Sequence, residues 1–472
     1  MRVRSSALLL FALASAASCA PHARPPSSRV FATLRYDIDV TDAPVLHVHA
    51  HFETTGSEKL SVGDAMVGAV SKLEVSRPAG WEAVPPHDGT YDVPECRRAC
   101  DVRYTLDVSA GAHGQDGVVI AGGGSISPSY AWLLKPMPLP QGSVHFTFAG
   151  DGVAVPVGSF TDGHFATGLS PRGFSTEAFN EGSLSAFGAF RVADVAVPGA
   201  TIRVSVAGTM PKLGEAGVLK WVQDAGTCLS QLYGHFPVPR ASIFLIPAPG
   251  AVEPVFGKVL SLGGPSIMVV TGSDYDGTGM HDDWVLLHEM VHLGTPTFVG
   301  KHRWLGEGLA TYFEPRLRAR MGWITPARLF RFWAREMRRG VPDAGDKRPL
   351  DERDSIDDIY WGGALFLMLS DVHIRVATKG AHALDDVVRH MVEQGGDATV
   401  VWSIDQFLKA GDEATGTGVL REMYERYGKG NEHPDLEGLL KSLGIAAKAG
   451  GTEDEIELVD APLASVRDAL AR

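Results

Sequence analysis

Hydrophobic and polar positions follow two different patterns in the two parts of this chain. From about residue 30 onward, hydrophobic residues recur at every second position, as in Leu34, Tyr36 and Ile38. Successive side chains of a strand point to opposite faces of a sheet, so this period predicts strands with one buried face. Clusters of Gly and Pro separate the runs. We therefore predict an antiparallel β-sandwich domain over residues 30–208.

The pattern changes after Met210, where helical periodicity begins. Asp282 and Asp283 can cap a helix that runs to about Leu293, with Gly294 just past its end. The polar, acidic stretch from residue 449 is expected to be loosely ordered. The other predicted elements are buried strands at Ser242–Ile246 and Ile267–Val270, and helices over 213–234, from near Trp304, from Thr325 to Gly340, and over roughly 355–376, 384–394 and 403–410.

The motif that carries chemistry is His-Glu-Met-Val-His at residues 288–292, inside one of these predicted helices. Residues four apart lie one above the other on a helix, so His288 and His292 can converge on one metal ion. Glu289 flanks the same site and is placed to take a proton from water there. The motif alone arises by chance in roughly a few per cent of chains of this size, so its context matters.

Glu307 supplies that context, fifteen positions after His292 in WLGEGLATYFE (304–314). A carboxylate on a second, antiparallel helix can be the third metal ligand. Two histidines and one carboxylate leave a fourth position open, as a catalytic zinc site requires. The alternative is an exposed residue on an amphipathic helix, which the small and apolar neighbours of Glu307 disfavour.

The HEMVH helix followed by WLGEGLATYFE resembles the gluzincin peptidases. It is more similar to the glycyl aminopeptidase family than to the aminopeptidase N family. YWGGAL (360–365) and LDDV (384–387) are similar to later helices of the first family, and the resemblance covers roughly 215–445. It implies a thermolysin-like zinc peptidase domain with a helical C-terminal part, a Zn²⁺ cofactor and a peptide or protein substrate.

The resemblance also implies roles for five residues. His288, His292 and Glu307 would bind zinc, and Glu289 would act as general base and then as general acid. Tyr360 would donate its hydroxyl to the oxyanion of the tetrahedral intermediate, where developing charge needs a directional donor besides the metal. An aromatic residue that packs into the core at a helix start is the alternative interpretation of Tyr360.

Two departures from the family concern the substrate. The peptidases named above hold the free amine of the substrate with a Glu-containing segment on the strand before the zinc helix. The corresponding stretch here, FGKVLSLGGPS (256–266), has no carboxylate, and Gly362 stands where the family has Lys. Glu253 and Glu314 are alternative amine anchors. The choice between exopeptidase and endopeptidase therefore stays open.

The N-terminus predicts export. Basic residues precede an apolar run from Ala7 to Ala17, which is typical of a secretory signal and too short to span a membrane. The run leads to Cys19, which resembles a lipoprotein processing site. A lipid on Cys19 would anchor the protein to a membrane through a flexible tether over residues 20–29. The alternative is ordinary cleavage and secretion without a lipid.

The composition and the cysteines of the chain limit the cellular compartment and the binding partners that we expect. The net charge of −13 gives no support for nucleic acid as a partner, because a phosphate-binding surface needs a basic patch. In an oxidising compartment, the spacing of Cys96 and Cys100 favours a local disulfide over a metal site. Cys228 is expected to be a buried thiol. The sequence does not indicate an oligomeric state.

Two weaker patterns have simpler interpretations than a ligand site. His47, His49 and His51 alternate on a predicted strand, which indicates the solvent face of a sheet rather than a metal-binding row. The Arg-rich stretch 316–339 could meet lipid headgroups or an acidic substrate, but a solvated helix face is the default interpretation.

The sequence therefore predicts an α+β chain that hydrolyses peptide bonds with zinc. The rivals are a catalytically inactive zinc-binding lipoprotein with a binding or scaffolding role, and a structural lipoprotein with a coincidental motif. Glu289 disfavours the first rival, and the open three-ligand set disfavours the second. The predicted parts are a signal peptide (1–19), a tether (20–29), a β-sandwich domain (30–208), a thermolysin-like catalytic domain (209–345), a helical C-terminal part (346–448) and an acidic tail (449–472).

Overall fold

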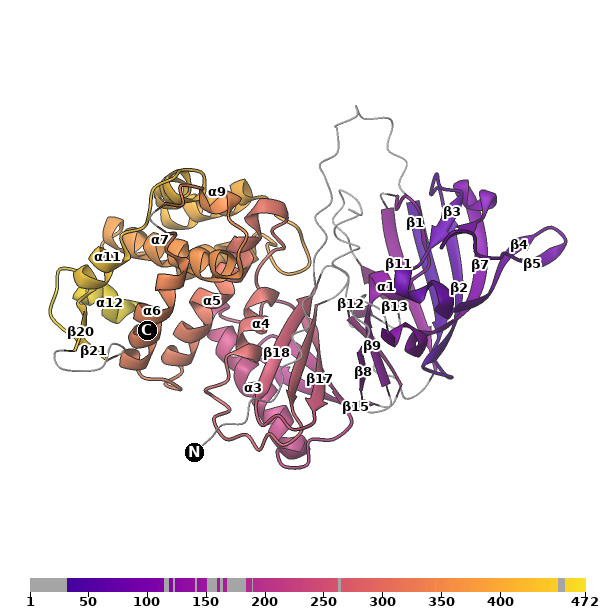
Figure 1. The fold of residues 1–472 in the computed structure, drawn as a ribbon, viewed down its shortest axis with the longest axis horizontal. Coiled ribbons are helices and arrows are strands. Elements are labelled where there is room, and N and C mark those ends of the chain that lie inside the picture. The colour runs from indigo at the N-terminus through magenta and orange to yellow at the C-terminus, as the bar shows by residue number, and fades with distance from the viewer. Residues whose placement is uncertain are drawn as a thin grey trace.

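The computed structural model describes most of the chain. The described residues are 32–113, 119–121, 124–140, 142–150, 159–161, 164–167, 184–188, 190–261, 265–343, 345–448 and 455–472. The expected signal, Cys19 and the tether lie outside them. Figure 1 shows a β-rich N-terminal part on the right, a second sheet in the middle and helices on the left.

An eight-stranded sheet in the order β12-β13-β11-β1-β2-β7-β4-β5 forms the base of the N-terminal part. Neighbouring strands are antiparallel except β1 and β11, which are parallel. The predicted alternation is confirmed on β1, where Leu34 and Tyr36 are buried and Arg35 and Asp37 are exposed. The strands are β1 (Ala32–Asp39), β2 (Val45–Glu53), β4 (Val70–Arg77), β5 (Gly80–Ala83), β7 (Ala99–Asp107), β11 (Gly142–Ala149), β12 (Ser159–Thr161) and β13 (His164–Thr167).

Two three-stranded sheets, β10-β3-β6 and β14-β9-β8, complete this part. Leu60 and Tyr91 of the first small sheet share one core with Leu34 and Tyr36 of the large sheet. The predicted β-sandwich is therefore confirmed, with layers of unequal size. The strands are β3 (Lys59–Ser61), β6 (Tyr91–Asp92), β8 (Val119–Ala121), β9 (Gly124–Pro128), β10 (Lys135–Pro136) and β14 (Leu184–Gly188), and a short helix α1 (Ser129–Trp132) follows β9.

The expected states of three cysteines are confirmed. Cys96 and Cys100 form a disulfide at the start of β7. Cys228 is a buried free thiol, and burial raises its pKa well above the usual value. A thiol of this kind is chemically inert, so Cys228 has a packing role.

The central sheet has five strands in the order β15-β16-β17-β19-β18. The structure therefore differs from the domain limit predicted at residue 208, because β15 and β16 belong to this sheet and not to the N-terminal one. The period of two is the same for a strand of any sheet, so it could not show this pairing. The strands are β15 (Phe190–Val197), β16 (Ala200–Ala207), β17 (Arg240–Ala248), β18 (Pro254–Leu260) and β19 (Ser266–Gly272).

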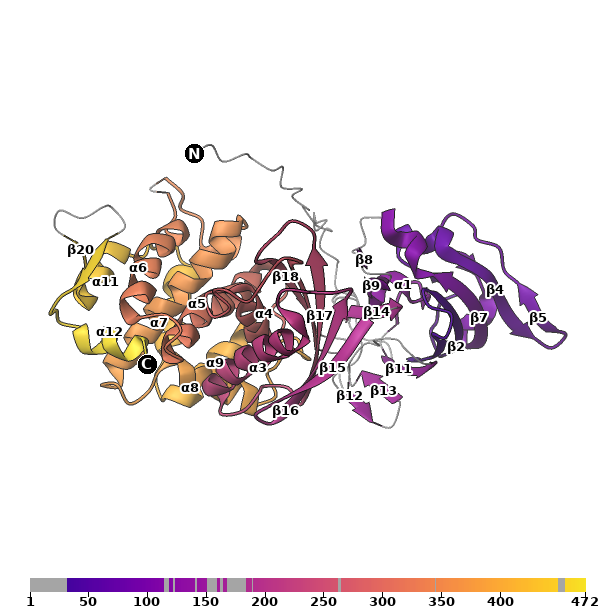
Figure 2. The ribbon, with the colours of Figure 1, turned by 90° about the horizontal axis from the view of Figure 1, so that it is seen from below.

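Both faces of the central sheet are covered. Ile243 and Leu245 of β17 pack with the helices, while Phe244 and Ile246 pack with β9 and β14 of the N-terminal part. This arrangement explains why β17 is a continuous hydrophobic run without polar alternation. Figure 2 shows helices α3 and α4 on one side of the sheet and β9 and β14 on the other.

Ten helices follow β16 in the described part of the chain, and the main predicted ones are confirmed. Thr325 caps α6 by accepting a hydrogen bond from the Arg328 amide, and Gly234 ends α3 with a φ of 83°. No helix among the described residues is long and apolar enough to cross a bilayer. The helices are α3 (Gly214–Tyr233), α4 (Val285–Leu293), α5 (Arg303–Arg320), α6 (Pro326–Glu336), α7 (Gly363–Ala377), α8 (Leu384–Glu393), α9 (Ile404–Thr415), α10 (Val419–Met423), α11 (Leu436–Leu443) and α12 (Ala464–Leu470).

Short helical turns and one small sheet connect these helices. The 3₁₀ turns are η1 (Asp64–Ala69), η2 (Pro94–Arg97), η3 (Val108–His113), η4 (Gly300–His302), η5 (Met337–Gly340) and η6 (Leu350–Glu352), and the π-helical turns are η7 (Asp358–Gly362) and η8 (Tyr424–Gly428). Strands β20 (Ile445–Ala447) and β21 (Ile456–Leu458) pair antiparallel. One hydrophobic core joins the central sheet to all the larger helices, so no separate core marks the predicted limit at 345.

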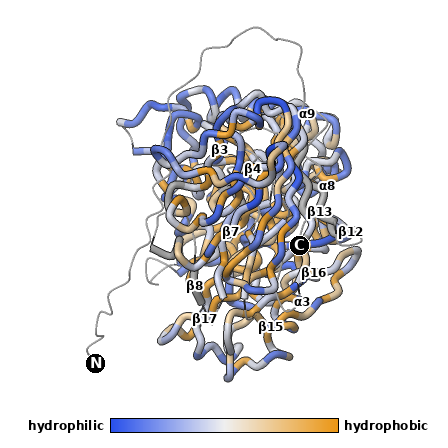
Figure 3. The backbone as a smooth tube through the Cα atoms, turned by 90° about the vertical axis from the view of Figure 1, so that its right-hand side faces the viewer, coloured by the Kyte–Doolittle hydropathy of each residue, from blue (hydrophilic) through white to orange (hydrophobic). Residues whose placement is uncertain are grey.

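The prediction of a loosely ordered tail is wrong for residues 455–472. They form β21 and α12, and Leu470 is fully buried. The guanidinium of Arg316 on α5 donates to the Leu470 carbonyl at 2.9 Å. The acidic residues before Ile456 led to the wrong prediction, because a few well-spaced apolar residues after them dock on the core. Figure 3 shows the same separation over the whole molecule: hydrophilic stretches are concentrated in outer loops and hydrophobic ones along inner strands.

Candidate metal centre

Helix α4 carries the His-Glu-x-x-His motif through the core. Asp283 caps it, because its carboxylate accepts from the amides of Val285 at 2.9 Å and Leu286 at 3.4 Å. Every residue of α4 except His292 is buried. The helix is therefore held on all sides, and the rings of His288 and His292 lie 5.1 Å apart on one face.

Helix α5 brings Glu307 to this pair. One carboxylate oxygen of Glu307 lies 3.3 Å from Nε2 of His288 and 3.5 Å from Nε2 of His292. Close contact between α5 and α7 fixes the position of the carboxylate. A Cβ on Gly308 would lie 2.6 Å from the carbonyl carbon of Gly363, so only glycine allows this approach.

The three residues fit a zinc ion. Their ligand atoms all lie within 4.8 Å of one another, and no other such group of three occurs among the described residues. Zinc bonds of about 2.0–2.2 Å in tetrahedral geometry place two ligand atoms about 3.3–3.6 Å apart, which matches the distances above. Burial would raise the pKa of Glu307, but the charge of His292 and hydrogen bonds from both imidazoles hold it well below its usual range. The carboxylate is therefore ionised, as a ligand must be.

Glu289 lies between the candidate metal ligands and the edge of the central sheet. Burial raises its pKa, and the charges of His288 and His292 oppose that rise. A Cβ on Gly257 of β18 would lie 2.4 Å from Cγ of Glu289, so the strand passes directly over this carboxylate. Strand β18 is also the edge of the described sheet, so its outer row of backbone groups has no strand partner among the described residues.

Tyr360 stands in the π-helical turn η7 beside the ligands. Its ring stacks on the ring of His288, with centroids 5.8 Å apart and an angle of 9°. Burial and the charges of Glu307 and Glu289 raise the pKa of Tyr360 well above its usual value. The hydroxyl therefore keeps its proton and can donate it in a hydrogen bond. π-Helical turns are frequent at functional sites.

The sequence did not single out Trp284, the residue immediately before α4. Its side chain is 52 % exposed, and its ring lies 5.5 Å from the ring of His288. A residue four positions before a ligand lies one helical turn away on the same face. The four-residue spacing between Trp284 and His288 was the feature of the sequence that could have identified Trp284 as a neighbour of the site.

The structure separates the two alternative amine anchors. Glu314 is buried and ion-paired with Arg318, so its carboxylate is not available to a substrate amine. Glu253 is exposed in the segment before β18. At Gly362, a Cβ would lie 2.9 Å from Cδ1 of Leu350, so a lysine there would require Leu350 to move.

The histidine row and the Arg-rich stretch lie outside the metal centre. His47 and His49 are half exposed on β2, and His49 and His51 share the carboxylate of Asp101. The residues between and before them are buried, as predicted: Leu46, Val48 and Ala50.

The interpretation of 316–339 as a solvated face is wrong for its first two arginines. Arg316 and Arg318 are buried, and Asp385 of α8 pairs with Arg316 at 2.9 Å. Arg316 is buried against an acidic partner from a distant segment, which a local charge pattern cannot reveal, whereas Arg318 pairs with Glu314 one turn before it on α5.

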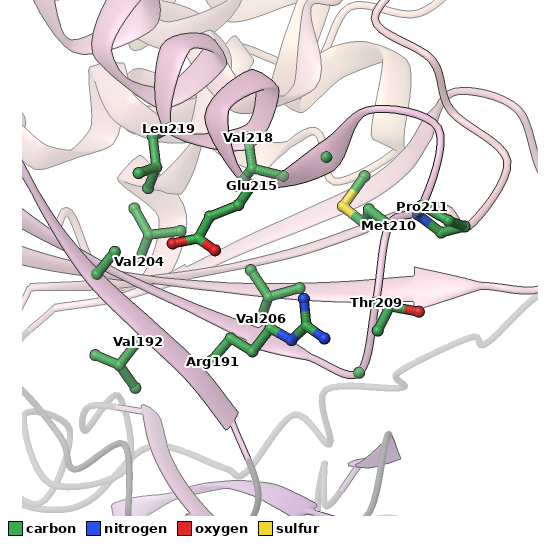
Figure 4. Close-up of a pocket in the computed structure, with 13 residues that line it drawn as sticks. Arg191, Val192, Val204, Val206, Thr209, Met210, Pro211, Glu215, Val218 and Leu219 are labelled. Atoms are coloured by element: carbon green, nitrogen blue, oxygen red, sulfur yellow. The ribbon is translucent and has the colours of Figure 1, made fainter.

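A further hollow lies between α3 and the β15–β16 edge of the central sheet. It has a volume of about 280 Å³, and Arg191 and Glu215 stand among apolar side chains such as Val204, Val206 and Leu219 (Figure 4). Its lining includes no residue of the metal centre.

Comparisons with known proteins identify the fold. No protein-family model matches the chain, and no curated protein sequence matches it. Among solved structures, an aminopeptidase N family protein from Idiomarina loihiensis is 13% identical, with 87% of this chain and 78% of that one covered and a TM-score of 0.63. Leukotriene A4 hydrolase from Saccharomyces cerevisiae is 13% identical, with 86% and 68% covered and a TM-score of 0.52. An M1 zinc metallopeptidase from Deinococcus radiodurans is 16% identical, with 86% and 94% covered and a TM-score of 0.50. The chain therefore has the fold of the M1 zinc metallopeptidases.

Proposed function

We propose that this protein is a zinc-dependent metallopeptidase that hydrolyses peptide bonds. The observation that carries the proposal is the convergence of His288, His292 and Glu307 around one point, with Glu289 beside it. Zinc is part of the proposal because two imidazoles and a carboxylate are the ligand set of catalytic zinc sites. The likeness to structures named as zinc metallopeptidases supports both parts.

The chemistry follows from the environment of each side chain. A zinc ion bound here would supply a Lewis acid that polarises a carbonyl and lowers the pKa of water to about 7. Glu289 takes a proton from the attacking water and returns it to the leaving nitrogen, and its raised pKa suits both roles. Tyr360 donates a hydrogen bond to the carbonyl oxygen as negative charge develops there.

A peptide backbone suits the surface beside these groups. Among the described strands β18 pairs with β19 alone, so one row of its backbone amides and carbonyls has no strand partner there. An extended peptide that pairs with this row passes Gly257 and therefore Glu289. This placement favours a peptide over a small-molecule substrate.

The test is the cleavage of one peptide library, with free and with acetylated N-termini, by the zinc-loaded protein. We expect cleavage that a chelator abolishes and added zinc restores. Loss of cleavage on acetylation would indicate an aminopeptidase, with the exposed Glu253 as the first candidate anchor. Equal cleavage of both libraries would indicate an endopeptidase. If zinc binds and neither library is cut, the protein is the catalytically inactive zinc-binding alternative.

Replacement of Tyr360 by phenylalanine is expected to lower kcat about 10²–10³-fold, because one oxyanion donor is lost in the transition state. KM should change little, since the ring and its stacking on His288 remain. Steady-state kinetics with a cleaved library peptide measure both constants. An unchanged kcat would leave Tyr360 with the packing role alone.

The proposal extends to location. Export is expected from the N-terminal sequence, and the Cys96–Cys100 disulfide supports an oxidising compartment. We expect the mature protein to begin at a lipid-modified Cys19 in the cell envelope. Mass spectrometry of its N-terminal peptide distinguishes this form from an unmodified, secreted one.

A further inference from the structure

Trp284 forms part of an aromatic wall at the metal centre. Besides His292, the ring of His288 has two aromatic neighbours that are at least partly exposed, Trp284 at 5.5 Å and Tyr360 at 5.8 Å. Trp284 meets the imidazole edge-on, at 87°, while Tyr360 lies parallel to it. The two rings therefore border His288 from different directions, and each reaches the surface beside the ligands.

Trp284 is the most exposed tryptophan of the described residues. It is 52% exposed, compared with 36% for Trp81 and less than 2% for Trp132, Trp304 and Trp333. Its backbone position needs no tryptophan, because Asp283 supplies the helix cap. A large apolar ring left in water at a polar site is typical of a surface that a ligand covers.

The edge strand adds apolar surface next to the same helix. Val255 is 54% exposed and Phe256 is 43% exposed on β18, which packs against α4 through Gly257 and Glu289. The two elements that border the general base thus carry three exposed, large hydrophobic side chains. Lys258 is the only charged residue of β18.

From these contacts, we infer that Trp284 forms the apolar subsite for the substrate side chain next to the scissile bond. The peptidase then prefers a bulky apolar residue, such as Phe or Leu, at that position over Gly or an acidic residue. An acidic side chain placed against Trp284 would lose its hydration, and the negative face of the indole ring would offer it no attraction in return. This inference rests on the proposed function and names the substrate class of the same site.

The experiment measures side-chain preference and binding separately. Library cleavage by the zinc-loaded protein is compared for wild type, Trp284→Ala, Trp284→Phe and, as a matched control, Trp81→Ala on the distant strand β5. Two library peptides that differ only in Phe or Gly beside the cleaved bond are then titrated by calorimetry into zinc-loaded Glu289→Gln, with and without Trp284→Ala. Zinc content is measured in every variant.

We expect kcat/KM to favour the Phe peptide about tenfold or more in wild type and in Trp81→Ala. The ratio should fall below about threefold in Trp284→Ala and recover in part in Trp284→Phe, with the same changes in the binding ratio. Cleavage without an apolar preference, or a preference that Trp284→Ala leaves unchanged, would overturn the inference. If Phe-selective binding depends on Trp284 but wild type cuts no peptide, the subsite stands and the proposed peptidase activity fails.

Discussion

Glu289→Gln is expected to lower kcat for peptide hydrolysis by about 10²–10⁴-fold, the usual contribution of a positioned general base. The side chain is almost completely buried and lies between Gly257 and the metal ligands. Glutamine has the same shape, so the packing against β18 should not change. It cannot accept the proton of the attacking water, however, so only the chemical step is affected.

Zinc content and thermal stability separate this effect from damage to the site. Both should match wild type, because His288, His292 and Glu307 are untouched. Glu215→Gln is a suitable control, since Glu215 is exposed on α3 and no metal-centre residue lines its hollow. Steady-state kinetics on a cleaved peptide give the ratio of the variant kcat to the wild-type kcat. If Glu289→Gln keeps more than about a tenth of the wild-type kcat, another residue is the base.

The candidate site was predictable because its signals are local. His288 and His292 are four residues apart, and the carboxylate cap at Asp283 lies within a dozen positions of both. Glu307 required one further step, the expectation that a second helix of small and apolar residues packs beside the first. Gly308 makes that packing possible, because any larger residue would meet the backbone at Gly363.

The features that the sequence did not reveal depend on contacts between distant segments. β16 alternates as a strand of the N-terminal sheet would, yet it pairs in parallel with β17, more than thirty residues later. The last helix docks because the Arg316 guanidinium donates a hydrogen bond to the Leu470 carbonyl, 154 positions away. Gly257 gains its importance only from the Glu289 side chain that lies against it. In each case the local pattern predicts the helix or strand, but a contact with a distant segment determines what that helix or strand does in the structure.

Zinc is expected to raise the melting temperature of the metal-free protein, and His292→Ala is expected to abolish most of that increase. A ligand that binds only the folded state stabilises it by about 4 kcal/mol at a free concentration 1,000 times its Kd. His292 is the more exposed of the two imidazole ligands, so its truncation should disturb the core less than truncation of His288. His87→Ala, on an exposed turn, is the matched control and should respond to zinc as wild type does.

The same measurement has a predictable dependence on pH. In the metal-free protein, burial would lower the pKa of His292, but the charge of Glu307 and its hydrogen bond raise it above the usual value. Zinc must displace that proton, so its apparent affinity falls as pH drops through the raised pKa. The increase in melting temperature should therefore be larger at pH 8 than at pH 6. Scanning calorimetry with and without zinc at both pH values tests this. An equal zinc effect in wild type and His292→Ala would place the metal elsewhere, because a site without this imidazole keeps only His288 and Glu307.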